Sequence, residues 1–370
     1  MHTKQDAASS ANAKRSAGGP AAAVSAGLAG RKLDAFLVAL GPNLRYLSGF
    51  TGSNGSLLVT PEERVLFTDP RYAIQAKQEA PACRVAILKG KLTDAVAAAI
   101  SSRRLTRIGF EPARTTCDRL EALKARLPMR AALEPVTGWI ETLRMVKSPE
   151  EIGRIRRSVL LNSRAFEQAV SRLHPGVSER DFAAELEYRM RRLGAEKPSF
   201  ETIVAGGVRS ALPHAQPGPA PLRGLVVVDM GAFVEGYASD MTRMIHVGVP
   251  NARVKRAYKA VLEAQLAAID AVRAGVAAER VDRAARKTLK AYGLDRAFIH
   301  STGHGLGLEI HEPPRLGVRE KTLLRAGMAI TIEPGVYIEG WGGIRIEDTV
   351  LVTETGCEIL TPTPKSLRQV

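Results

Sequence analysis

The sequence predicts an α/β domain followed by a second domain that combines helices and strands. Strand and helix patterns alternate from about residue 31 to about residue 145, and a helix-start signal at Ser148 then opens a different pattern. The chain has 370 residues, of which 45% are hydrophobic and 25% are charged, a composition typical of folded proteins. A chain of this length can bury two hydrophobic cores, so we expect two domains.

Short apolar runs bounded by turn residues predict strands in the first domain, at 35–40, 56–60, 64–68, 84–88 and 107–110. Helical patterns separate or follow them, at 70–79, 92–101 and 116–126. Strands that alternate with helices are typical of an α/β domain, which we place at residues 31–145. Residues 1–30 are rich in Ala, Ser and Gly and predict a disordered tail rather than a signal peptide, because they lack a strongly apolar core.

The second domain, placed at residues 146–370, begins with a marked helix start. Ser148 is the expected cap, because Pro149 takes the first helical position and the acidic Glu151 follows three residues after the cap. An apolar stripe of one helix follows, at positions 152, 155, 159, 166, 170 and 173. Further helices are predicted at 179–193, 252–274 and 279–292. Strands and glycine-rich turns are expected over 298–362.

The composition argues against several classes of protein. No stretch approaches about 18 uninterrupted apolar residues, so no membrane-spanning helix is expected. The three cysteines, Cys83, Cys117 and Cys357, lie far apart and form no CxxC motif. A disulfide scaffold and a cysteine zinc site are therefore not expected, and a cytoplasmic location is favoured.

The net charge is strongly positive. Lys and Arg number 53 against 38 Asp and Glu, which gives +15. Such a charge can attract nucleic acid or an acidic membrane surface. The basic residues are spread over many predicted helices, however, and aromatic residues make up only 5% of the chain. We interpret the charge as solvated helix faces and expect neither nucleic acid nor a membrane as a partner.

A predicted hairpin carries the first candidate site residues. One apolar strand ends near Asp229 and a second begins near Asp240, and a glycine-containing turn joins the two. The two aspartates are symmetric about the point between Val234 and Glu235, which predicts direct cross-strand partners with Cβ atoms about 4.5–5.5 Å apart. Two facing carboxylates repel unless one is protonated or a cation lies between them. The alternative is a bulge that turns one of them to solvent.

Three further segments carry chemistry-bearing side chains. His300, His304 and His311 fall within 12 positions of a glycine-rich segment, where the backbone can approach a ligand or metal closely. Glu333 ends an apolar strand immediately before a proline. Arg345 and Glu347 share one face of another predicted strand, so the arginine can hold its neighbour ionised. Taken singly, these residues are also compatible with packed or surface positions.

Together, these residues form a ligand set for metal ions. Four carboxylates supply oxygen and one histidine supplies nitrogen, from Asp229, Asp240, Glu333, Glu347 and the histidine segment. A set dominated by carboxylates with one imidazole suits Mn²⁺, or Fe²⁺, Co²⁺ or Zn²⁺. Two divalent ions would balance four negative charges, and a pair roughly 3.5–4 Å apart can activate one hydroxide.

The chain resembles the creatinase/aminopeptidase P superfamily of pita-bread fold, which includes methionine aminopeptidase, prolidase and Xaa-Pro aminopeptidase. The five ligand positions match that family, at Asp229, Asp240, His304, Glu333 and Glu347. Their spacings of 11, 64, 29 and 14 are similar to those of the prolidase/aminopeptidase P branch. Segments 43–55, 68–72, 200–207 and 212–214 resemble it too, so that the resemblance covers about residues 31–363.

The resemblance implies a creatinase/prolidase-like N-terminal α/β domain and an α+β pita-bread catalytic domain. It implies that Asp229 chelates one metal, that His304 and Glu333 chelate the other, and that Asp240 and Glu347 bridge them. Glu333 would also shuttle the proton from the attacking water to the leaving nitrogen.

The resemblance also implies roles for residues around the ligands. His311 and His214 would donate hydrogen bonds to the substrate and the developing oxyanion. His300 would line the pocket. Arg345, with Tyr337, would either orient ligands or meet a substrate carboxylate.

The activity implied by the resemblance is metal-dependent hydrolysis, by a bridging hydroxide, of the Xaa-Pro bond at the N-terminus of peptides. The expected partners are peptides with proline at the second position, the expected cofactor is a pair of Mn²⁺ ions, and the expected assembly is a homodimer. Xaa-Pro dipeptidase, that is prolidase, is the alternative. Methionine aminopeptidase fits less well, because such enzymes generally lack a domain like residues 31–145. A non-catalytic binding protein on the same fold is disfavoured, because none of the five ligands is replaced.

Overall fold

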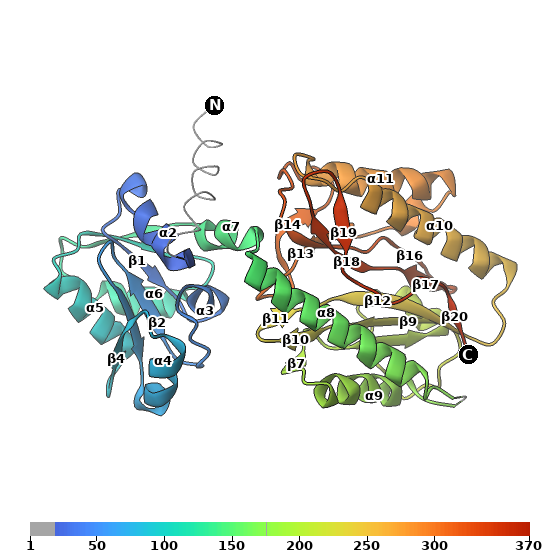
Figure 1. Cartoon of the computed structure of the whole chain (residues 1–370), viewed down its shortest axis with the longest axis horizontal. Coiled ribbons are helices and arrows are strands. Elements are labelled where there is room, and N and C mark those ends of the chain that lie inside the picture. Colours follow the sequence, from blue (N-terminus) through green and yellow to red (C-terminus); the bar gives the residue numbers. More distant parts are fainter. Residues whose placement is uncertain (1–18, 175) are drawn as a thin grey trace. The chain divides into compact units, whose positions relative to one another are not determined.

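The computed structural model describes residues 19–174 and 176–370 and contains two compact units, Met1–Arg144 and Met145–Val370 (Figure 1). Each unit has its own sheets and hydrophobic core, and we describe them separately. Among the described residues, no helix is both long and apolar enough to cross a membrane.

The first unit is built on one mixed sheet with the strand order β4-β3-β2-β1-β5-β6. The strands are β1 Ala35–Val38, β2 Ser56–Val59, β3 Arg64–Thr68, β4 Arg84–Ile87, β5 Arg107–Phe110 and β6 Ala132–Pro135. The helices are α2 Gly19–Gly27, α3 Pro42–Ser48, α4 Ala73–Glu79, α5 Leu92–Ser102, α6 Cys117–Lys124 and α7 Trp139–Met145, the last of which reaches the boundary between the units. The α/β class expected from the alternating pattern is confirmed, although α3, β6 and α7 were not predicted.

Alternate residues of β1 face two different cores. Phe36 and Val38 pack in one cluster with residues of α2 and α3, whereas Ala35 and Leu37 pack in another with residues of α5 and α6. This alternation follows from the period of two along a strand. A strand buried on both faces reads as a continuous apolar run, which is why residues 35–40 were recognisable as a strand.

The disordered tail expected for residues 1–30 is wrong for its described part. Residues 19–27 form α2, and Ala21, Val24 and Leu28 are buried in the core of the first unit. These small and aliphatic side chains recur at spacings of three and four, which places them on one helix face. The composition concealed this face, because alanine contributes little to an apolar pattern. Residues 1–18 lie outside the described part of the chain.

Replacing Leu28 tests this packing. Leu28 is 0% exposed, so Leu28→Ala should lower the free energy of unfolding of the first unit by about 2–5 kcal/mol, through lost burial and a new cavity. The measurement is urea unfolding followed by fluorescence of Trp139, which lies in the same core, in a Trp341→Phe background. Met129→Ala, at a fully exposed position of the same unit, should change stability by less than about 0.5 kcal/mol. Equal effects of the two variants would show that Leu28 does not pack.

The second unit contains four long helices. They are α8 Pro149–Val170, α9 Glu179–Arg192, α10 Ala252–Asp270 and α11 Ala278–Ala291. The cap predicted at Ser148 is confirmed, because its side chain accepts from the Glu151 amide while the Glu151 side chain accepts from the Ser148 amide. Ser178 caps α9 in a similar way. Helix α10 ends at Asp270, four residues before the predicted end.

Two main sheets lie between the helix pairs. One has the order β20-β12-β9-β8 and the other the order β14-β13-β15-β18-β19. Their strands are β8 Ile203–Gly206, β9 Gly224–Met230, β12 Met241–Val247, β13 Gly303–Gly305, β14 Glu312–Leu316, β15 Ala329–Ile332, β18 Asp348–Val352, β19 Cys357–Ile359 and β20 Arg368–Gln369. Smaller sheets contain β7 Lys197–Pro198, β10 Ala232–Val234 and β11 Tyr237–Ala238, and β16 Gly335–Ile338 with β17 Gly342–Arg345.

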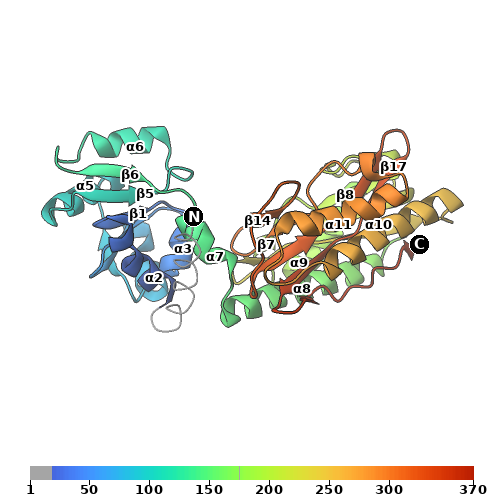
Figure 2. The same cartoon turned by 90° about the horizontal axis from the view of Figure 1, so that it is seen from above.

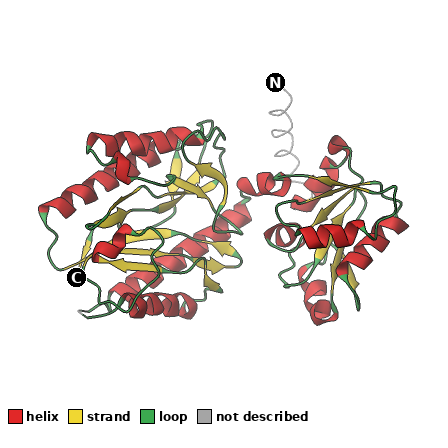
Figure 3. Ribbon diagram, turned by 180° about the vertical axis from the view of Figure 1, so that it is seen from behind, coloured by secondary structure: helices red, strands yellow, loops and turns green. Residues whose placement is uncertain are grey.

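The helices cover the outer faces of these sheets. Helices α8 and α9 share a core cluster with Val228 and Ile245 of the first sheet. Helices α10 and α11 share another with Ile330 and Val350 of the second sheet. Figure 2 shows α10 and α11 running side by side, and Figure 3 shows the strands as an inner layer with helices outside them. The faces of the sheets that point inwards are therefore available for a site.

The hairpin of Asp229 and Asp240 is centred one residue later than predicted. Strand β9 pairs with β12 so that Asp229 lies opposite Thr242, not opposite Asp240. The turn is formed by Glu235 and Gly236, which both have positive φ, at 50° and 76°. A two-residue turn with two positive φ angles matches the twist of antiparallel strands, and the glycine adopts such an angle without strain. Asp229 and Asp240 are therefore diagonal neighbours.

Candidate metal centre

The five predicted ligands come from the inner strands and their ends. Asp229 lies on β9, His304 lies on β13, and Asp240 lies between β11 and β12. Glu333 follows β15 directly, and Glu347 lies between β17 and β18. Antiparallel pairing of β9 with β12, and of β13 and β18 with β15, brings these separate segments together.

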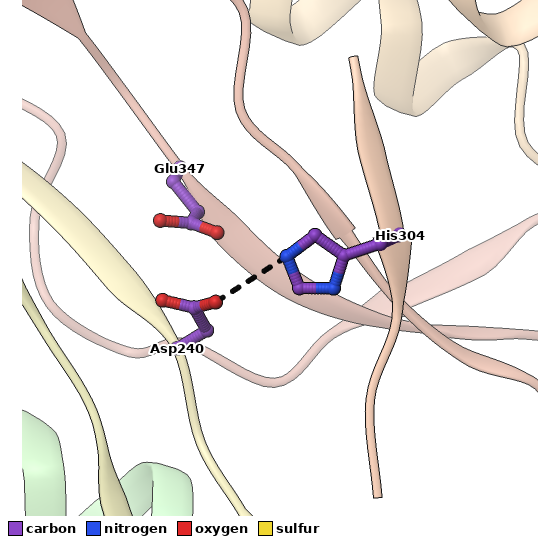
Figure 4. Close-up of side chains that lie close together, drawn as sticks. All are labelled: Asp240, His304 and Glu347. Atoms are coloured by element: carbon purple, nitrogen blue, oxygen red, sulfur yellow. Dashed lines mark ion pairs between the residues drawn. The ribbon is translucent and has the colours of Figure 1, made fainter. Parts of the chain in front are cut away.

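Three of the five side chains form a tight cluster. One ligand atom each of Asp240, His304 and Glu347 lies within 4.8 Å of the other two, and Figure 4 shows the three side chains converging. His304 Nε2 lies 3.6 Å from Asp240 Oδ2 and 3.4 Å from Glu333 Oε1, so Glu333 borders the same space.

Asp229, the fifth predicted ligand, is held by Arg345. Its Oδ2 accepts a hydrogen bond from Arg345 Nη2 at 2.6 Å. Its charge also helps to raise the pKa of Asp240, Glu333 and Glu347, so it lies close to all three. The structure thus brings all five predicted ligands into one region.

Burial and mutual repulsion raise the pKa of three carboxyl groups. Desolvation is the largest cause for Asp240, Glu333 and Glu347, and the neighbouring carboxylates add to it. The pKa of Glu333 rises to about 8, although the Arg345 guanidinium lowers it. A group of acids that resists ionisation in this way is what a divalent cation would relieve.

The polar atoms left over at the site fit a metal. Asp229 Oδ1 and Glu347 Oε1 are buried and have no hydrogen-bond partner among the described residues. Burying a carboxylate oxygen without a partner is costly, so each such atom indicates a missing positive partner. Carboxylate oxygens are ligands that suit Mn²⁺.

His304 is prepared as a neutral ligand. Burial, followed by the neighbouring His311, lowers the pKa of His304 to about 4. His304 Nδ1 faces the carbonyl oxygen of Gly305 at 3.0 Å, which holds the proton on Nδ1. The lone pair of Nε2 is then directed at the carboxylates, as in histidines that bind metals.

Thr242 was not among the predicted site residues, yet it joins two of them. Its Oγ1 donates to Glu347 Oε2 at 2.8 Å and accepts from Arg345 Nε at 2.9 Å. Its place opposite Asp229 depends on the register of the hairpin, which the sequence did not give correctly. The signal that could have identified it is its position two residues after Asp240, because residues two apart on a strand share a face.

Arg345 is fully engaged inside the site. It is 3% exposed and donates to Asp229, Thr242, the hydroxyl of Tyr337 and the carbonyl oxygen of Pro213. These contacts favour the orienting role over contact with a substrate carboxylate.

The remaining predicted residues surround this network. His300 Nε2 lies 3.0 Å from the Tyr337 hydroxyl, and burial, followed by the charge of Arg345, lowers the pKa of His300 to about 4. The ring centroid of His311 lies 4.4 Å from that of His304. His214 is exposed, and its charge lowers the pKa of both His300 and His311, which places it near both.

Comparison with family models and known proteins identifies the chain. The model of metallopeptidase family M24 matches residues 153–354, which include all five ligands. The chain belongs to metallopeptidase family M24. The model of the creatinase/prolidase N-terminal domain matches residues 22–146.

The family is also evident from individual relatives. An Xaa-Pro dipeptidase of Pyrococcus horikoshii is 39% identical over 338 residues, which cover 90% of this chain and 94% of that protein. The structure of an Xaa-Pro dipeptidase from Bacillus anthracis superposes with a TM-score of 0.90 at 38% identity, covering 93% of this chain and 97% of that one. An X-Pro aminopeptidase from Thermotoga maritima superposes with a TM-score of 0.86 at 38% identity, covering 92% and 98%.

These matches confirm the predicted superfamily, its pita-bread fold and a metallopeptidase activity. Members of this family are metallopeptidases, and the carboxylates and the histidine described above are the groups of this chain that could hold a metal.

The pH dependence of stability tests the electrostatics of the site. In the metal-free protein, the raised carboxyl pKa values make the folded state bind more protons than the unfolded chain. This stabilisation is complete below the unfolded pKa and is lost as the pH rises through about 8, the pKa of Glu333. The lowered pKa values of His300 and His304 make stability rise with pH up to about pH 6.5, so the carboxyl effect is isolated above that range. We therefore expect the Tm of the chelated protein to fall between about pH 7 and about pH 9.

A matched variant isolates the carboxyl contribution. Glu333→Gln cannot ionise at that position, so its Tm should fall less steeply over the same pH range. Excess Mn²⁺ should flatten the wild-type profile, because the cation replaces the protons. Identical slopes for the wild type and Glu333→Gln would contradict the raised pKa.

Proposed function

We propose that this M24 peptidase uses two divalent metal ions to hydrolyse the bond between an amino acid and a following proline. The observation that carries the proposal is the buried group of four carboxylates and one neutral imidazole. Within the described part of the chain, two of its buried carboxylate oxygens have no hydrogen-bond partner. Two divalent cations would balance four carboxylates, and Mn²⁺ suits the oxygen-rich set.

The metal ions, when bound, would polarise the scissile carbonyl and activate a water molecule. Asp229 would hold one of them, His304 and Glu333 the other, and Asp240 and Glu347 both. Thr242 supports this assignment, because it orients Glu347 through a hydrogen bond of 2.8 Å.

Glu333 is proposed as the group that moves the proton. Its side chain is partly exposed and borders the ligand cluster, where Thr331 Oγ1 lies 3.2 Å from Glu333 Oε1. A carboxyl group near the reacting water can take its proton and give it to the leaving nitrogen. This second step matters for an Xaa-Pro bond, because the proline nitrogen leaves as a secondary amine and must be protonated.

His214, His300 and His311 are proposed to contact the substrate. His311 and His214 are exposed beside the ligands and can donate hydrogen bonds to the carbonyl oxygen as it gains charge. His300 is held against Tyr337 in its neutral form, which suits a wall of the slot for the proline ring. Arg345 would orient Asp229 directly and Glu347 through Thr242.

We place the Xaa-Pro dipeptidase activity first and the Xaa-Pro aminopeptidase activity second. The sequence resemblance favoured the aminopeptidase, and the relative from Thermotoga maritima keeps that alternative open. The names of the relatives from Pyrococcus horikoshii, Pyrococcus furiosus and Bacillus anthracis favour the dipeptidase. A homodimer and a cytoplasmic location remain predictions, and the three free cysteines are compatible with a reducing compartment.

Hydrolysis of two substrates by the Mn²⁺-loaded protein separates these activities. We expect steady turnover of Gly-Pro and little of Gly-Pro-Pro-Ala. Efficient cleavage of the tetrapeptide after its first residue would instead assign the aminopeptidase activity. Gly-Ala controls for the proline, and equal turnover of Gly-Ala and Gly-Pro would overturn the proposed specificity.

Asp240→Asn tests the two-metal assignment in the same assay. The variant is nearly isosteric but loses a bridging charge, so turnover should fall by more than about 100-fold, beyond the usual effect of changes outside the ligand set. Metal analysis should show fewer than two ions bound per chain. An Asp240→Asn variant that binds one ion and stays fully active would contradict two-metal catalysis.

A further inference from the structure

One segment outside the ligand set is hydrogen-bonded to two strands of the site. Residues 360–370, here called the strap, begin beside β18, where the Leu360 amide donates to the Thr349 carbonyl oxygen at 2.9 Å. The strap ends beside β12, where β20 pairs with it and the Val370 amide donates to the His246 carbonyl oxygen at 3.0 Å. It therefore connects the strand that follows Glu347 to the strand that carries Thr242.

Arg243 joins the strap to the backbone of the site. It is 2% exposed, and its Nη1 donates to the carbonyl oxygens of Glu347 at 2.5 Å and Thr242 at 3.0 Å. Its Nη2 donates to the Thr363 carbonyl oxygen at 2.6 Å, and its Nε donates to that of Pro364 at 3.1 Å. One rigid guanidinium thus fixes the distance between the strap and the main chain of Glu347.

Asp348 forms the second link. It is 0% exposed, and its Oδ1 accepts from Arg243 Nη2 at 2.7 Å. Its Oδ2 lies 2.5 Å from Lys365 Nζ in the strap and accepts from Gln265 Nε2 at 2.9 Å. Lys365 also donates to Gln265 Oε1 at 2.9 Å, so α10 holds it from the other side. A carboxylate without exposure to solvent needs such cations, and Asp348 adjoins Glu347 in the chain.

We propose that Lys365 and Arg243 are positioning residues for the metal centre. Through Asp348 and the backbone of Glu347 they fix the direction of the Glu347 carboxylate, which Thr242 holds from the opposite side. Groups that orient ligands commonly set metal affinity as strongly as they set activity. The inference rests on the proposed function, because that proposal makes Glu347 a ligand.

The test compares Mn²⁺ affinity in variants of the full chain, measured by competition with a fluorescent chelator. Lys365→Met removes one cation from Asp348 while keeping most of the side chain's volume, and should weaken Mn²⁺ binding about tenfold or more. Lys365→Arg keeps the charge and should restore most of the affinity. Arg368→Met removes a cation from an exposed position of the same strap and should leave affinity unchanged.

Affinity separates positioning from a merely structural role. A structural role would lower the Tm of Lys365→Met without changing the Mn²⁺ affinity of the folded protein, and that result would overturn the inference. If Lys365→Met does not fold, the isosteric Asp348→Asn provides the same comparison and should also bind Mn²⁺ at least tenfold more weakly. A wild-type protein that binds no Mn²⁺ would overturn the proposed function and this inference together.

Discussion

The crowding of carboxylates in a buried space is the constraint on which the catalytic unit depends. Asp240 and Glu347 lie beside one another with almost no exposure, and Asp229 and Glu333 add two further charges. Packing alone would not gather these groups, because desolvation and repulsion both oppose their ionisation. The fold compensates for part of this with Arg345, whose guanidinium carries one charge against four. Bound protons or divalent cations must offset the remaining imbalance, which is why the pKa values of Asp240, Glu333 and Glu347 are raised in the metal-free protein.

Hydrogen bonds from neighbouring residues hold these charged groups in place. Thr242 holds Glu347 and Arg345 at once, so that the direction of a carboxylate and that of its counter-charge are linked. On the far side of Glu347, Arg243 and Asp348 form a buried ion pair. A buried pair contributes little net stability, because desolvation offsets the attraction, but it fixes orientation. The alternation along β12 explains the arrangement, since Thr242 and Arg243 point to opposite faces of one strand.

The sequence was sufficient for most of the fold and for the family, and the five ligands that it predicts lie in one region of the structure. The Ser148 cap and the alternating elements of the first unit depend on local patterns, which can be recognised without knowledge of packing. The choice of His304 among the histidines depended on the family resemblance. The pairing of Asp229 with Thr242 was not predicted, because a shift of the turn by one residue moves every cross-strand partner by two positions. Helix α2 was missed because its buried face is made largely of alanine. The strap was missed because contacts such as that of Arg243 with Thr363 join residues 120 positions apart.

Differences in burial among the histidines explain how one segment can supply both a ligand and substrate contacts. His304 lies beside the carboxylates, where burial keeps it neutral and the Gly305 carbonyl oxygen holds its proton on Nδ1, so its Nε2 has a free lone pair that can bind a metal. His311 lies seven residues later, past a glycine-rich turn, with its ring near that of His304 but exposed to solvent. Burial lowers the pKa of His311 as well, which favours its neutral form, and a neutral imidazole can still donate one hydrogen bond from its N–H. The different roles proposed for the two histidines follow from the backbone between them, which leaves the ring of His311 more exposed than that of His304.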